Sequence, residues 1–141
     1  MKRIKDKAKE IKEFISELDS IMPDDLAEYK SSIEKKAACE RYLEKIVEAM
    51  TDLAFLVIKA RRLKIPEDDI DAFNILLENK IVDKDLTAKV KNAKGMRNIL
   101  AHQYGKVDDG IVFDALKTKI MKDAESFSRQ VLKVTGKRPI N

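Results

Sequence analysis

Apolar residues recur every three or four positions along most of the chain, the spacing of one face of an α-helix. The first stripe spans residues 2–21 and consists of Ile4, Ala8, Ile11, Ile15 and Leu18. Pro23 interrupts the pattern, and Asp24 or Asp25 can cap the next helix, because a short polar side chain satisfies free N–H groups at a helix start. The pattern therefore predicts a second helix over residues 26–63.

The predicted second helix changes character along its length. Up to Glu48, charged residues surround an apolar stripe of Ile33, Ala37, Tyr42, Leu43, Ile46 and Val47. From Leu53 to Ile58 the helix is apolar on every side, and such a segment must be buried on every side. In so small a domain one of those faces can belong to a second copy of the chain, which predicts a homodimer. The alternative is that other helices of the same chain cover it.

Three shorter helices follow. A helix over residues 70–79, capped by Asp68 or Asp69, packs Phe73, Leu76 and Leu77. The next begins near Asp83 or Asp85 and ends before Gly105, since glycine is favoured just after a helix end. The last covers residues 111–134 and buries Val112, Leu116, Ile120, Phe127 and Val131.

The pattern as a whole predicts an all-α, up-and-down bundle of about five helices, with one domain over residues 1–141 and a flexible tail at 135–141. Only 4 glycines and 3 prolines, with 38% charged residues, agree with long helices. The 29 basic and 25 acidic residues give a net charge of +4, which permits an RNA partner without requiring one. A single cysteine, a charged N-terminus and no long apolar run predict a cytoplasmic protein with no membrane contact.

The candidate chemistry lies in the fourth predicted helix. His102 is the only histidine of the chain, with Arg97 and Asn98 before it and Tyr104 two residues after it. One histidine and one cysteine cannot supply the usual nitrogen and sulfur ligands of zinc, so we expect no metal and no cofactor. A cation and an imidazole suit a phosphodiester, because the cation binds its oxygens and the imidazole moves a proton near neutral pH.

Helical geometry gives Arg97 an unusual position. At 100° per residue it falls within the apolar stripe formed by Leu86, Val90, Ala93 and Leu100. Arg97 must therefore extend to solvent, pair with a carboxylate, or be held there for a purpose. Arg97 and His102 are five residues apart, about 140° around the helix, so a straight helix does not bring them together. A loosened helix end, the long arginine side chain, or a twofold dimer would each solve this.

The run from Arg97 to Tyr104 resembles the Arg-x4-His-x-Tyr signature of the HEPN superfamily, specifically its HepT-like toxin branch. The resemblance covers roughly residues 28–132, and further similar positions occur in the same order: Glu40 to Lys45, Asp52 to Ala54, Pro66, Met96 and Asp108. It implies a dimeric helical bundle and an endoribonuclease toxin with Arg97, Asn98 and His102 as catalytic residues. It also implies an antitoxin, an MNT-type nucleotidyltransferase that attaches AMP to Tyr104.

A ribonuclease without a metal uses the 2′-hydroxyl of its RNA substrate as nucleophile, which leaves a 2′,3′-cyclic phosphate. Such cleavage requires a base, an acid and positive charge on the phosphorus oxygens. The alternative function is a non-catalytic HEPN module that docks a nucleotidyltransferase and presents substrate to it. An intact motif favours the enzyme, whereas Arg97 held in a core ion pair would favour the module.

Two further groups of charged residues are weaker candidates. Lys59, Arg61, Arg62 and Lys64 can guide RNA phosphates or simply provide favourable charge at a helix C-terminus. Arg41 and Asp52 are eleven residues apart and so share one face of the second helix. We expect them to support polar groups of the motif, the alternative being local partners.

Overall fold

The computed structural model describes residues 1–102 and 107–135, which form helices joined by short connections, with no strand among them. Its elements are α1 (Lys2–Ile21), α2 (Leu26–Ser31), α3 (Ile33–Ala60), α4 (Asp69–Glu78), α5 (Lys84–His102), α6 (Asp109–Asp114), the π-helical η1 (Ala115–Ile120) and α7 (Met121–Thr135). The predicted all-α bundle is confirmed. The predicted flexible tail lies beyond the described residues, apart from Thr135, which ends α7 and is buried.

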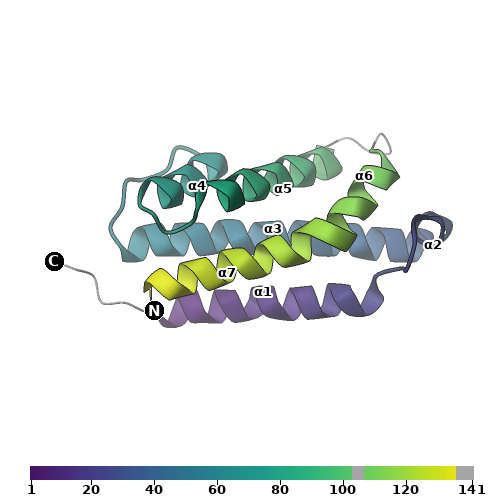
Figure 1. The fold of residues 1–141 in the computed structure, drawn as a ribbon, viewed down its shortest axis with the longest axis horizontal. Helices are drawn as coiled ribbons and strands as arrows, with labels where there is room; N and C mark the ends of the chain where they lie inside the picture. Colours follow the sequence, from purple (N-terminus) through teal and green to yellow (C-terminus); the bar gives the residue numbers. More distant parts are fainter. Residues whose placement is uncertain (103–106, 136–141) are drawn as a thin grey trace.

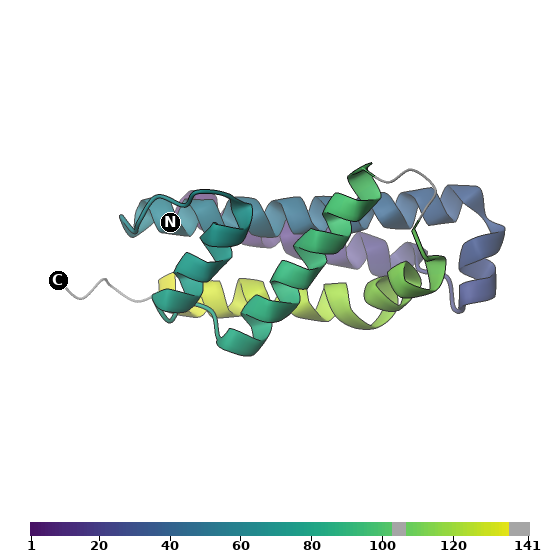
Figure 2. The same ribbon diagram turned by 90° about the horizontal axis from the view of Figure 1, so that it is seen from above.

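Three long helices form the frame of the bundle. The helices α1, α3 and α7 lie lengthwise beside one another, and each packs against the other two (Figure 1). Helix α5 crosses obliquely over α3 and α7, and α4 joins it over one end of α3 (Figure 2). After α5 the chain continues through α6, η1 and α7, which together form an arm that runs back along the bundle. One side of α5 faces this arm. The C-terminal part of α5 contacts α3.

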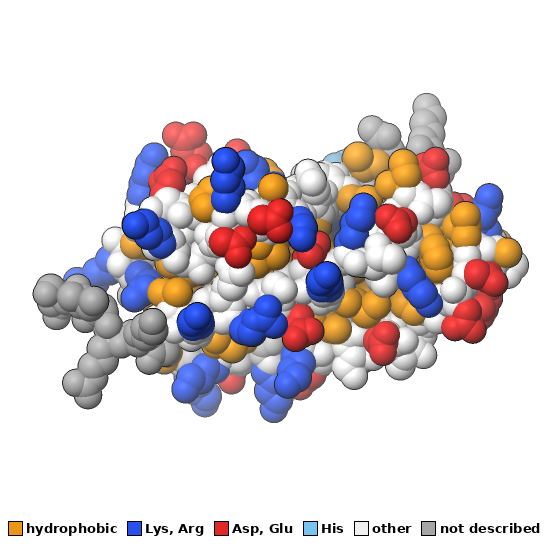
Figure 3. All heavy atoms as spheres, in the orientation of Figure 1, with side chains coloured by type: hydrophobic (Ala, Val, Ile, Leu, Met, Phe, Trp, Pro, Cys, Tyr) orange, Lys and Arg blue, Asp and Glu red, His pale blue; other side chains and the backbone are white. Residues whose placement is uncertain are grey.

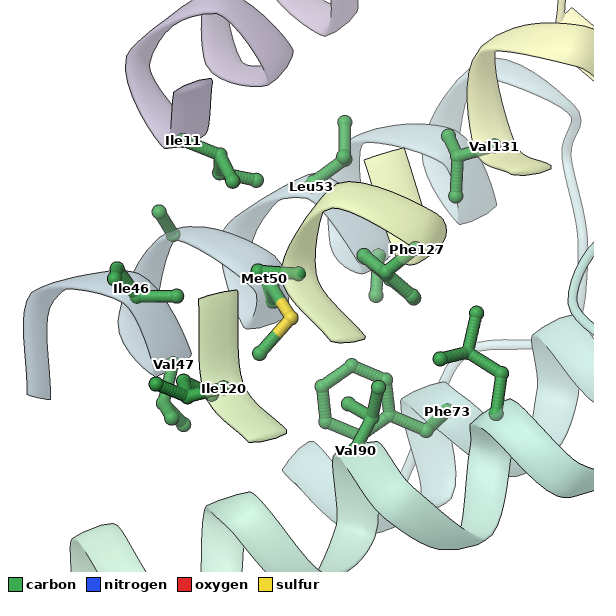
Figure 4. Close-up of a cluster of buried hydrophobic side chains, with 14 of the residues drawn as sticks. Ile11, Ile46, Val47, Met50, Leu53, Phe73, Val90, Ile120, Phe127 and Val131 are labelled. Carbon is green, nitrogen blue, oxygen red and sulfur yellow. The ribbon is translucent and has the colours of Figure 1, made fainter. Parts of the chain in front are cut away.

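The core lies where these helices meet (Figure 4). It includes Ile11 of α1, Met50 and Leu53 of α3, and Phe73 of α4, all at most 1% exposed. The ring of Phe73 meets that of Phe127 edge-on, with centroids 5.8 Å apart, a favourable aromatic arrangement. The apolar residues predicted for the last helix are all buried: Val112, Leu116, Ile120, Phe127 and Val131.

The predicted second helix is in fact two helices. Ser32 has an extended backbone, with φ −119° and ψ 108°, and its side chain accepts a hydrogen bond from Lys35 N. It therefore caps a new helix, α3, while Asp25 caps α2. The chain changes direction at Ser32, and the first residues of the predicted apolar stripe are not buried. Ile33 is 85% exposed and Ala37 is exposed too, so this part of the prediction is wrong. The stripe from Leu43 onward is confirmed, with Leu43, Ile46 and Val47 fully buried.

The all-apolar stretch of α3 is covered mostly by its own chain. Leu53, Ala54, Val57 and Ile58 are at most 4% exposed, whereas Phe55 remains 37% exposed. The other helices thus bury most of this stretch within one chain. Phe55 and the half-buried Leu56 mark the part of it that they leave open, so the homodimer stays a prediction.

The last predicted helix is continuous but irregular. Asp108 caps it by accepting hydrogen bonds from the backbone N–H groups of Gly110 and Ile111. The helix then passes through the wider π-helical turns of η1 before resuming as α7. This irregular segment was not foreseen, because the spacing of the apolar residues on either side fits an α-helix as well.

Asp83 sets the start of α5 and ties it to α7. Its carboxylate accepts hydrogen bonds from Leu86 N at 2.8 Å and from Gln130 Nε2 at 2.7 Å, while Gln130 Oε1 accepts one from Asp83 N at 2.9 Å. The backbone bond from Leu86, followed by the bond from Gln130, lowers the pKa of the Asp83 carboxyl. Asp83, and not Asp85, is therefore the cap.

Replacing Asp83 with alanine is expected to lower the free energy of unfolding at pH 7 by about 1 kcal/mol, the usual effect of losing a cap. Because the folded-state pKa is lowered, this contribution is present above the unfolded-state pKa and is lost as the pH falls through the folded-state pKa. Denaturant unfolding from pH 7 to pH 3 should show wild type and variant converging. Asp85→Ala, at an exposed neighbouring carboxylate, is the control; an equal effect there would contradict the assignment.

Candidate functional site

Arg97 reaches from α5 to α3. Its Nη2 donates a hydrogen bond to Glu48 Oε1 at 3.0 Å, and its Nη1 donates to Asn98 Oδ1 at 3.4 Å. Its Nε is buried without a hydrogen-bond partner among the described residues. The side chains of Arg97 and Glu48 are 25% and 41% exposed. The guanidinium is thus held in place by one carboxylate, and only part of its hydrogen-bonding capacity is used.

The stripe predicted around Arg97 is confirmed. Leu86 and Val90 are buried, and Ala93 and Leu100 are partly buried against the core. Pairing with a carboxylate is one of the three solutions that the sequence left open for Arg97. Glu48 was not among the candidate residues. The only signal for it was its place in the acidic series Glu44, Glu48 and Asp52 at helical spacing, which does not say which member α5 will meet.

Asn98 and His102 lie on the outer face of α5. Both side chains are exposed, and His102 is the last residue of the helix. No hydrogen bond joins Arg97 and His102 among the described residues, as their angular separation predicted. Tyr104 lies outside the described residues.

Helix α4 holds this part of α5 in place. Lys94 is 8% exposed and its Nζ lies 2.8 Å from Asp69 Oδ2. One turn earlier, Lys91 Nζ donates a hydrogen bond to Asn74 Oδ1 at 3.1 Å. The motif is thus anchored on one side by α4 and on the other by Glu48 of α3.

The expected support by Arg41 and Asp52 is not found for the described part of the motif. Arg41 pairs with Glu44 at 3.1 Å on its own helix, and Asp52 pairs with Lys7 of α1 at 3.6 Å. Arg41 therefore has the local partner that was the alternative, whereas the partner of Asp52 lies on another helix. Glu48, between them on α3, occupies the place that they were expected to take.

The four candidate basic residues Lys59, Arg61, Arg62 and Lys64 lie at the C-terminal end of α3 and just after it. Lys59 and Arg62, with Arg3 and Phe55, line an open cavity of about 610 Å³. Arg62 has φ 55°, and the N–H of the next residue, Leu63, bonds to Ile58 O, so this segment closes the helix. Lys59 is eleven residues from Glu48, roughly 16 Å along the helix axis. The structure does not bring Lys59, Arg61, Arg62 or Lys64 to the motif, and their contact with RNA stays a prediction.

Across residues 1–102 and 107–135, no three His, Cys, Asp or Glu side chains gather closely enough to hold a metal ion. In the same residues no helix is both long and apolar enough to cross a membrane. What the described site offers chemically is a positioned guanidinium bonded to an exposed amide, with an exposed imidazole five residues further along α5. These groups can bind a phosphodiester and move one proton.

Comparison with known proteins identifies the family of the chain. Residues 6–131 match the HepT-like ribonuclease family. An mRNA nuclease HepT from Shewanella oneidensis is 29% identical over 85 residues, covering 60% of this chain and 63% of that protein. A tRNA nuclease HepT from Aphanizomenon flos-aquae is 29% identical over 91 residues, covering 64% of this chain and 62% of that protein. The matches thus span less than two thirds of those two nucleases.

The fold has a counterpart of known structure. A Shewanella oneidensis HEPN toxin, solved in tri-AMPylated form in complex with an MNT antitoxin, superposes with a TM-score of 0.85. The two sequences are 25% identical, and the superposition covers 92% of this chain and 96% of that one. With 92% of the chain superposed, the 20-residue helix α1 cannot be left out entirely, so the similarity extends before the stretch of resemblance seen in the sequence.

Proposed function

The chain belongs to the HepT-like ribonuclease family, and we propose that it is a metal-independent endoribonuclease that acts as the toxin of a toxin–antitoxin pair. The observation that carries the proposal is the position of Arg97, Asn98 and His102 together at the C-terminal end of α5. Arg97 is anchored by Glu48, whereas Asn98 and His102 are open to solvent. A large substrate can reach all three.

The proposed reaction uses the RNA's own 2′-hydroxyl. Its oxygen bonds to the adjacent phosphorus, the bond from phosphorus to the 5′-oxygen breaks, and the products carry a 2′,3′-cyclic phosphate and a 5′-hydroxyl. His102 takes the proton of the 2′-hydroxyl or supplies one to the leaving 5′-oxygen. Arg97 stabilises the charge that builds up on the phosphorus oxygens, and Asn98 orients the imidazole or the phosphate.

We expect a homodimer, because one histidine cannot readily act as base and as acid in the same step. The second copy would supply the second histidine. The exposed side of α3 is the proposed contact. Glu48 and Phe55 are seven residues apart, within about 20° of one another around the helix. The partly exposed Phe55 ring therefore lies on the face that also anchors Arg97. A second copy bound there would bring two motifs near each other.

The proposed antitoxin is an MNT-type nucleotidyltransferase that attaches AMP to Tyr104. The related Shewanella oneidensis toxin has been solved AMPylated and bound to such an antitoxin. Tyr104 follows His102 by two residues, so an added adenylate would place a bulky anion beside the motif. It would repel the phosphate of an incoming RNA and block it sterically.

The non-catalytic docking module would be favoured by an Arg97 sealed in a core ion pair. Its partner Glu48 is 41% exposed, so the pair is open to water and the guanidinium can exchange a contact for a phosphate. This observation supports the enzyme over the module.

The test is to incubate the full chain with total tRNA and with mRNA in the presence of EDTA. We expect cleavage that survives the chelator and leaves 2′,3′-cyclic phosphate ends. If the properly folded dimer leaves every RNA intact, the proposed activity is wrong and the docking module replaces it.

A further inference from the structure

A cleft runs between α5 and the arm made of α6, η1 and α7. It consists of two cavities of about 450 and 490 Å³ that share Asn92, Met96 and Ile111 and so form one groove. Cavities of this size hold small-molecule ligands. Leu43 of α3 and Ile120 of η1, both buried, line its inner part. The same arm lies at the front of Figure 3, where apolar side chains are exposed between the charged ones.

Asp123 lines the inner cavity of this cleft and is only 9% exposed. Among the described residues no cation lies within 4 Å of its carboxylate, since Lys89 pairs with Asp85 at 3.1 Å and Lys119 with Asp114 at 3.3 Å. Burial raises the pKa of the carboxyl. The carboxylate is thus largely buried without an ion pair, which is costly to the fold. Its oxygens are not among the fully enclosed unpaired polar atoms of the described residues, so they remain open to the cleft. Its position one turn after π-helical η1, a kind of segment frequent at functional sites, suggests that it is kept for a ligand.

Gly95 lines the other end of the cleft. A Cβ atom built on it would have no neighbour within 4 Å, so the fold of this chain does not require a glycine there. Glycine in the middle of a helix is less favourable than alanine. Gly95, Asn98 and His102 follow at spacings of three and four, which places them along one side of α5. The bare backbone therefore lies next to the motif and allows a ligand to approach the helix closely.

We propose that this cleft binds a guanine of the RNA substrate next to the cleaved bond, with the base held by Asp123 and the strand passing over Gly95. The proposal rests on the proposed function. An ionised carboxylate only accepts hydrogen bonds, and guanine alone among the four bases presents two neighbouring N–H donors on its Watson–Crick edge. Leu43, Met96 and Ile120 supply the apolar surface against which an unpaired base packs.

The charges around Asp123 suit a nucleotide. Lys89, Lys119 and Lys122 line the same cavity. Lys89 and Lys119 are paired with Asp85 and Asp114, whereas Lys122 makes no ion pair among the described residues. A phosphate of the RNA can bind Lys122 while the N–H donors of its base bind the carboxylate. A nucleotide thus satisfies both groups, whereas an arginine or lysine of a partner protein would satisfy the carboxylate alone.

The test compares Asp123→Asn and Gly95→Ala with wild type by thermal unfolding and by sequencing of RNA cleavage ends. Both variants should unfold at a higher temperature, because one loses a buried unpaired charge and the other gains helix propensity. Asp123→Asn should reduce the preference for guanine beside the cleaved bond roughly tenfold or more. Gly95→Ala should reduce cleavage of every RNA. Asp114→Asn, an exposed carboxylate on the same arm, is the control for both readouts.

Binding measurements separate this proposal from the proposed activity. In a His102→Ala background, guanine-containing oligonucleotides should bind more tightly than adenine-containing ones, and Asp123→Asn should remove the difference even if the wild type cleaves nothing. Competition by free GMP distinguishes a site for the free nucleotide from one that needs the RNA strand. Unchanged base preference in Asp123→Asn, or a lower unfolding temperature, would overturn the proposal. So would a loss of antitoxin binding with RNA selection intact, which would assign the cleft to protein docking.

Discussion

His102→Ala is expected to lower kcat/KM for RNA cleavage by roughly 10²–10⁴, the usual contribution of a positioned acid or base. The fold should be preserved, because His102 is exposed and ends α5, so its removal leaves no cavity. Cleavage is measured on a single tRNA, and the unfolding temperature is measured in parallel. Tyr104→Phe is the matched control, since it removes the proposed AMPylation site and should keep cleavage. A His102→Ala variant within a few-fold of wild type would mean that His102 is not the catalytic base or acid.

Arg97→Ala is expected to produce the second largest loss, roughly 10²–10³ in kcat, as seen when one stabilising donor is removed from an active site. Arg97→Lys should restore little of it, because a lysine is a point charge without the planar fork that binds two phosphate oxygens. Arg41→Ala is the control, an arginine that also pairs with a glutamate of α3 but makes no hydrogen bond or ion pair to the described part of the motif. Equal losses at Arg41 and Arg97 would show a general effect of charge on RNA binding.

Glu48 acts through Arg97 and is therefore a positioning residue. Glu48→Gln keeps a hydrogen-bond acceptor for the guanidinium and should lower kcat by only a few-fold. Its effect should disappear in the Arg97→Ala background, since the residue it positions is then absent. An undiminished effect in that background would give Glu48 a role of its own.

Much of the fold could be predicted because burial follows the helical period. Leu86 and Val90 are buried as their spacing requires, as is the apolar series of the last helix. For α2, α4 and α5 the sequence offers two nearby aspartates each as the N-terminal cap. In the structure the caps are Asp25, Asp68 and Asp83. The break at Ser32 was missed because serine is tolerated inside a helix, and its extended backbone depends on how α2 packs.

The site was only partly predictable, since the motif is local but its supports are not. The position of Arg97 within the apolar stripe required an unusual partner, and the structure supplies Glu48. Choosing Glu48 over Asp52 depends on the angle at which α5 crosses α3, which no spacing within one helix determines. The same holds for Asp123, whose lack of an ion pair is set by where α5 and the final arm lie. The spacing of residues along the sequence shows which face of a helix a residue lies on. Which residue of another helix it contacts depends on how the helices pack.

In the proposed reaction the 2′-hydroxyl of the RNA is the nucleophile. The most direct test is an RNA oligonucleotide carrying a single 2′-deoxy nucleotide immediately 5′ of a mapped cleavage site, incubated with the full chain in EDTA. We expect that bond to remain intact, while the unmodified oligonucleotide is cut there and leaves a 2′,3′-cyclic phosphate. Cleavage of the modified bond at the rate of the unmodified one would contradict the proposed mechanism, because water or another nucleophile would then be attacking the phosphorus.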